Sequence, residues 1–187
     1  NARDKDGRTA FMTACIFGKK DVVKFFLDHS EKIDLNAIVD HGRTAFMISC
    51  ICGHKDVVKL LLDHSERIDL SARDDYGRTA FMLACEYGHN DVVKLLLDKT
   101  DRNIELNART NQGMTAFMWA CYTGHKDVVK MLLDKTDGNI DLNASSNHGR
   151  TAFVWACHNG QKDVVKLLLD KTDRSIELNA RDNLGRT

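Results

Sequence analysis

The sequence predicts an all-α fold, a solenoid of stacked helix-turn-helix units with short β-hairpin-like arms between them. Two observations lead to this prediction. The block Gly-Arg-Thr-Ala-Phe-Met recurs with small changes, and the block Asp-Val-Val-Lys recurs in step with it. The first block begins at Gly7, Gly42, Gly77, Gly113 and Gly149, and a truncated copy begins at Gly185. Because self-similarity at a period of about 20 to 50 residues is typical of repeat architectures, each period of 35 or 36 residues is read as one structural unit.

The whole chain, residues 1–187, is therefore predicted to form a single array. The units span approximately residues 4–38, 39–73, 74–109, 110–145 and 146–181, with a partial sixth unit at 182–187. The sequence opens inside this pattern and has no initiator Met, so we expect a fragment of a longer protein.

The first helix of each unit is predicted from its threonine. In the first unit, Thr9 is a suitable N-cap, because its hydroxyl can accept a hydrogen bond from the first turn. A short helix is expected from Ala10 to Phe17. Gly18 suits the left-handed conformation that commonly ends a helix.

The second helix follows after a short turn. Asp21 lies in its first turn, where a carboxylate suits the positive end of the helix dipole. Val22, Val23, Phe26 and Leu27 recur at helical spacing and are expected to form its buried face.

An extended arm is expected to close the unit. The triplet from Ile33 to Leu35 alternates apolar, polar, apolar, which is typical of a strand. Asn36 and Ala37 then lead to a tight turn that ends at Gly42, since glycine and asparagine are common turn residues.

A helix, turn, helix and extended arm with this pattern resembles the ankyrin repeat, and the resemblance covers the entire chain. It depends on a Gly-His pair before the second helix, a Leu-rich run within that helix, and an Asn-Ala pair before the arm. The Gly-His pairs are Gly53-His54, Gly88-His89 and Gly124-His125, and the Asn-Ala pairs include Asn36-Ala37, Asn107-Ala108, Asn143-Ala144 and Asn179-Ala180. The resemblance implies that inner helices and arm tips form a concave surface that binds proteins.

The chain also departs from the family pattern. Thr-Ala-Phe-Met replaces the usual Thr-Pro-Leu-His. The Pro at the helix start and the His that would bond the Thr are therefore absent, and packing of the larger apolar side chains is expected in their place. Lys19 and Gln161 stand where the family has His, and Ser71 replaces the Asn of the arm. The units are two or three residues longer than the family norm. The extra residues lie in links such as 63–67 and 98–103, where bulkier loops and a changed curvature are expected.

Cysteine is the first candidate for chemistry. Five of the six, namely Cys15, Cys50, Cys85, Cys121 and Cys157, occupy one column of the repeat. Stacked helices lie roughly 8 to 10 Å apart, whereas a disulfide requires Cα atoms within about 7 Å. We therefore expect small core residues with free thiols, which favour a reducing, cytoplasmic setting.

No catalytic, cofactor or metal site is predicted. The sequence has no phosphate-binding glycine loop, no nucleophile elbow and no His-Glu-x-x-His motif. His54, His89 and His125 recur once per unit and are interpreted as capping groups at the turn into the second helix. The 27 basic and 27 acidic residues give no surplus of positive charge, which disfavours nucleic-acid and membrane partners.

A varied apolar strip on the first helices is the candidate site. At about 100° per residue, positions 13, 16 and 17 of the first unit lie opposite the core position of Phe11. Most residues at these positions in the five units are apolar or aromatic, and a strip of this kind usually marks a partner site. With varied residues at the arm tips, the candidate binding residues are Phe17, Ile48, Ile51, Tyr76, Leu83, Tyr87, Met114, Trp119, Tyr122, His148, Trp155 and His158.

Several interpretations of this strip are open. Packing and binding are both possible roles for Ile48, Leu83 and the two tryptophans. The strip could also pack on another part of a longer protein or on a second copy, since neither end carries the polar capping unit that a free-standing solenoid needs. Self-association through uncapped ends is therefore a further expectation.

The sequence thus predicts a non-catalytic module that binds a protein or peptide through its concave face, as a scaffold or adaptor. The alternative is the regulatory or targeting arm of a longer enzyme or effector.

Overall fold

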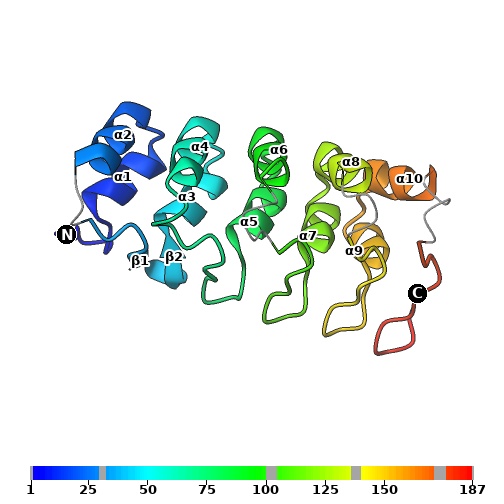
Figure 1. Cartoon of the computed structure of the whole chain (residues 1–187). Coiled ribbons are helices and arrows are strands. Elements are labelled where there is room, and N and C mark those ends of the chain that lie inside the picture. Colours follow the sequence, from blue (N-terminus) through cyan, green and yellow to red (C-terminus); the bar gives the residue numbers. More distant parts are fainter. Residues whose placement is uncertain (1, 30–32, 100–104, 136–139, 171–175, 187) are drawn as a thin grey trace.

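The computed structural model describes residues 2–29, 33–99, 105–135, 140–170 and 176–186. Within them the chain forms five helix pairs in a row (Figure 1), with the inner helices beside the arms and the outer helices in a second row. The inner helices are α1 (Ala10–Ile16), α3 (Ala45–Ile51), α5 (Ala80–Glu86), α7 (Ala116–Thr123) and α9 (Ala152–His158). The outer helices are α2 (Lys20–His29), α4 (Lys55–Asp63), α6 (Asn90–Leu97), α8 (Lys126–Lys135) and α10 (Lys162–Asp170). The predicted ankyrin-type solenoid is confirmed.

Each inner helix begins at the predicted threonine cap. The Thr9 hydroxyl accepts a hydrogen bond from the Met12 N–H at 3.2 Å, and the four later units repeat this contact. Helix α1 ends at Ile16, one residue earlier than expected, and Gly18 follows with φ 61°. A Cβ at Gly18 would lie 2.7 Å from the His54 ring, so both the turn and the close approach require glycine.

The core lies between the two rows of helices and between successive units. Val57, Val58, Leu61 and Leu62 of α4 are all buried, as the helical spacing predicts. The prediction fails for Val22 in α2, which is 47% exposed. The physical reason is that the described chain places no helix pair on that side of the first unit.

The recurring histidines join successive units. His54 Nε2 donates to the Ile16 carbonyl at 2.8 Å, and His89 Nε2 donates to the Ile51 carbonyl at 2.6 Å. Neither side chain caps its own outer helix, which corrects the predicted role. Each imidazole instead donates to a carbonyl at the end of the inner helix of the preceding unit, where backbone acceptors have no helical partner. Gln161 donates to the Tyr122 carbonyl at 3.1 Å and so performs the same task.

The arms project beyond the inner helices and are linked tip to tip. In the second unit, β1 (Ile38–Val39) pairs with β2 (Arg43–Thr44) in antiparallel register, Ile38 with Thr44 and Val39 with Arg43, around the turn η1 (Asp40–Gly42). Residues 33–35 do not form the expected strand. Backbone hydrogen bonds join the tips, for example from Asp75 N to the His41 carbonyl at 2.9 Å. The tips from the second arm to the last are therefore linked into one edge.

The longer links are described in part. In the link 63–67, Asp63 is the last residue of α4 and residues 64–67 form turns, with Ser65 N donating to the Leu62 carbonyl at 3.1 Å. Residues 100–103 lie outside the described residues. In the arm, the Asn36 amide donates to the Arg67 carbonyl of the next unit at 3.0 Å. Ser71, which replaces this Asn in the next unit, has a shorter side chain, and its hydroxyl donates to Asp69 within its own unit at 2.7 Å.

All six cysteines lie within the described residues and are free thiols. Four of the predicted column are buried, and burial raises the pKa of the Cys15 thiol to about 12 and the pKa values of Cys50, Cys85 and Cys121 above their usual range. The fifth, Cys157, is exposed and so departs from the prediction. No helix pair covers the far side of α9 in the described chain.

Candidate functional site

Three of the predicted binding residues belong to the core. Leu83 is fully buried, Ile48 and Met114 are nearly so, and none can present its side chain to a partner. For Leu83 and Ile48 the reason is that successive inner helices pack against each other, so a neighbouring unit covers positions that a single helical wheel assigns to solvent. Met114 precedes the Thr115 cap on its arm and belongs to the core cluster. The two tryptophans occupy the same column as Leu83 but are too large to be fully enclosed, and both are half-buried.

Four of the predicted residues form one contiguous cluster on α7 and α9. The rings of Trp119 and Tyr122 pack edge to face with centroids 5.6 Å apart, and Tyr122 and Trp155 do so at 5.5 Å. His158 extends the row from Trp155 at 5.9 Å. We call this row of four rings the aromatic ladder. Edge-to-face packing is a favourable arrangement for such rings, so the ladder has a defined geometry before any partner binds.

Both indoles of the aromatic ladder keep an unused donor. The Nε1–H groups of Trp119 and Trp155 are covered and have no hydrogen-bond partner in the described chain. A buried donor without a partner costs roughly 1 to 3 kcal/mol.

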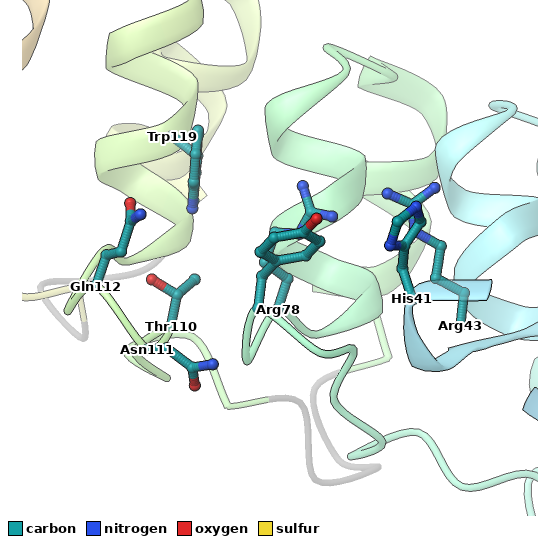
Figure 2. Close-up of a pocket in the computed structure, with 8 residues that line it drawn as sticks. His41, Arg43, Arg78, Thr110, Asn111, Gln112 and Trp119 are labelled. Atoms are coloured by element: carbon teal, nitrogen blue, oxygen red, sulfur yellow. The ribbon is translucent and has the colours of Figure 1, made fainter.

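A pocket of about 390 Å³ opens at the Trp119 end of the ladder. Figure 2 shows His41 and Arg43 on one side of it and Trp119 and Gln112 on the other, with Arg78 between them. We call it the central pocket, and its lining residues are His41, Arg43, Tyr76, Arg78, Thr110, Asn111, Gln112 and Trp119. It lies between the second, third and fourth arms and the inner helices.

A second hollow, of about 500 Å³, opens at the His158 end. Arg150 and Phe153 line it together with residues of the last arm, including Asp182 and Arg186. The Arg150 guanidinium also lies over the Trp155 ring, 4.7 Å from its centroid, which is a cation–π contact. The aromatic ladder therefore lies between two hollows on the side of the inner helices and arms.

Arginines line both hollows, and the sequence analysis missed them. Arg78 forms ion pairs with Asp74 at 2.8 Å and with Glu86 at 3.0 Å. Arg150 lies 3.6 Å from Asp182, whose pKa is held below its usual range chiefly by hydrogen bonds from Arg186. These residues follow the repeated glycine and looked like a uniform structural column. The sequence offered one sign that this column is more than structural, because Met114 replaces the arginine in the fourth unit.

The other predicted residues lie apart from the ladder. Tyr76 is half exposed on its arm tip, lines the central pocket, and lies 4.8 Å below the Arg78 guanidinium. Tyr87 and Phe17 are exposed at the ends of their inner helices, and Ile51 is partly buried. His148 is exposed on the fifth arm tip. A binding role for these residues stays a prediction.

Two further findings concern metal ligands and membrane-spanning helices in the described residues. They contain no group of three or more His, Cys, Asp or Glu side chains placed to hold a metal ion. Over the same ranges, no helix combines the length and apolar character needed to cross a bilayer.

Comparison with known proteins agrees with this geometry. A family model described as ankyrin repeats, in three copies, matches residues 1–74, 31–110, 66–146 and 102–182 in overlapping spans. No curated protein matches the chain. Ankyrin repeats are generally protein–protein interaction modules, and their fold is typically non-catalytic. Because the matched spans together cover residues 1–182, the chain belongs to the ankyrin repeat family.

Proposed function

We propose that this chain is a non-catalytic recognition module, a scaffold or adaptor, that binds a protein or peptide along its concave face. The observation that supports this most directly is the aromatic ladder, which lies between two hollows on the last two described units. Nothing in the internal packing of the stack requires four rings in a row. A concave surface with large, partly exposed rings at its centre is typical of a binding site.

The energetics favour this role. Trp and Tyr are the residue types most enriched among those that dominate binding energy, and they do so in well-packed central positions. The rings already hold one another in place, so little conformational entropy would be lost when a partner binds.

The test compares the wild-type chain with a Trp119→Ala/Trp155→Ala variant whose fold has been checked by circular dichroism. Phe25→Ala is the matched control, because Phe25 is an exposed aromatic residue on outer helix α2. Affinity capture from a native lysate identifies the partner, and calorimetry with the purified partner measures the affinity. We expect wild type and control to bind alike and the double variant to lose binding. Equal binding by all three chains would refute the proposal.

The compartment is part of the same proposal. Free thiols in every unit suit a reducing, cytoplasmic environment, where disulfides are rare. Imaging of the tagged chain in its native cell tests this, and secretion of the folded chain would contradict it.

The two ends of the array support a second candidate, self-association. Val22 at one end and Leu169 at the other are exposed, although the equivalent residues of the inner units are buried or nearly so. Sedimentation velocity over a range of concentrations should show association that Leu169→Glu weakens. A monomer at every concentration would reject this candidate.

A further inference from the structure

We propose that the central pocket receives an acidic side chain of the bound peptide, an Asp or Glu carboxylate, and that Arg43 is the residue that binds it. This inference rests on the proposed function and names the chemistry of the partner.

The lining of the central pocket is complementary to an anion. It contains the guanidinium groups of Arg43 and Arg78 and the imidazole of His41. No carboxylate from the described chain lines it, and its remaining polar groups are the uncharged side chains of Thr110, Asn111 and Gln112. An anionic group in this pocket would therefore meet two guanidinium groups first, with Asp74 and Glu86 behind the lining, where they pair with Arg78.

Arg43 is the cation that is available. Arg78 is held by its own unit, since its Nε donates to Asp74 at 2.8 Å and its terminal nitrogen donates to Glu86 at 3.0 Å. The Asp74 carboxylate lies 4.0 Å from Arg43 Nε, beyond hydrogen-bonding distance, and that buried Nε–H has no hydrogen-bond partner in the described chain. The Arg43 side chain is still 24% exposed. A charge-assisted pair with a carboxylate is among the stronger hydrogen bonds that arginine makes.

The pocket walls suggest what accompanies the acid. Trp119 lines one side, and Tyr76 lines the pocket 5.9 Å from the His41 ring. His41 has φ 65°, a left-handed conformation that is uncommon outside glycine, and its arm holds it in that conformation beside the pocket. An aliphatic or aromatic residue next to the acid would pack on these rings.

The experiment selects binders from a displayed library of random peptides against the full chain and then measures one selected peptide by fluorescence anisotropy. We expect Asp or Glu beside an apolar residue to be enriched. Arg43→Gln should weaken binding at least about tenfold, as should replacement of the peptide acid by its amide, and the two changes together should cost little more than either alone. Lys59→Gln on outer helix α4 removes the same charge away from the pocket and should leave binding unchanged. Arg43→Gln leaves the Asp74–Arg78 pair in place, so the fold should persist.

A second variant, Thr110→Asp, tests the same idea from inside the chain. The Thr110 hydroxyl accepts a hydrogen bond from Met114 N at 3.1 Å, and Asp74 accepts the equivalent bond from Arg78 N at 2.8 Å, so an Asp fits this position. Its second oxygen would add a carboxylate to the lining of the central pocket. We expect it to weaken the acidic peptide about tenfold or more through like-charge repulsion, without lowering the melting temperature.

The outcomes separate the two proposals. If selected peptides carry no acid and bind Arg43→Gln as tightly as wild type, the role of the central pocket is refuted while the concave face remains a binding surface. If neither the library nor a lysate yields any ligand for the wild-type chain, both proposals fail.

Discussion

Replacement of His89 by Ala should weaken the junction between the second and third units. His89 Nε2 donates to the Ile51 carbonyl at 2.6 Å, and its ring lies over Gly53, where a Cβ would collide with it. Alanine removes both the hydrogen bond and the ring packing, and the Ile51 carbonyl at the end of α3 is left without this donor. In a repeat array each unit contacts only its neighbours, so the loss falls on this one junction.

The expected magnitude follows from these two contributions. A typical intramolecular hydrogen bond contributes about 0.5 to 1.5 kcal/mol, and the half-buried ring adds a smaller packing term. The free energy of unfolding should therefore fall by about 1 to 2 kcal/mol. That is a large fraction of the stability of an ordinary domain.

The assay is urea unfolding followed by far-UV circular dichroism, from which the midpoint and slope give the free energy of unfolding. The chain itself provides the control, because Gln161 occupies the equivalent position and donates to the Tyr122 carbonyl at 3.1 Å. His89→Gln should therefore stay within about 0.5 kcal/mol of wild type. If His89→Ala and His89→Gln are equally stable, the histidine does not join the units and the reasoning is wrong.

Three other predictions concern the remaining groups. Leu83→Ala should cost about 2 to 5 kcal/mol in urea unfolding, whereas Tyr87→Ala, at a residue 44% exposed, should stay within about 0.5 kcal/mol; similar costs would contradict their assignment to core and surface. Under native conditions a thiol reagent should modify Cys157 before the four buried cysteines, and an order set by chance would contradict the burial pattern. Hydrogen bonds from Arg186 lower the pKa of Asp182, so its stabilisation of the last arm should be complete above its unfolded pKa of about 3.9 and be lost as pH falls through the lower folded pKa. Amide exchange of that arm in wild type and Asp182→Asn should show a difference at neutral pH that disappears in acid.

The architecture could be predicted because every unit repeats the same sequence pattern. Thr115 caps α7 as Thr9 caps α1, and the buried cysteine column follows from small residues recurring at one position. Local rules of capping and helical spacing act within a few residues, and the repetition confirmed them several times over. The errors at Val22 and Cys157 arise at the two ends, where the same residue types have no neighbouring unit to bury them.

The candidate site was only partly predictable for a different reason. A helical wheel treats a helix alone, and it placed Leu83 and Trp119 in one outward column. In the stack the neighbouring inner helix encloses the smaller side chain and leaves the larger one at the rim, so side-chain volume decides between core and surface. The central pocket could not be found in this way at all, because it depends on which residues of different arms face each other.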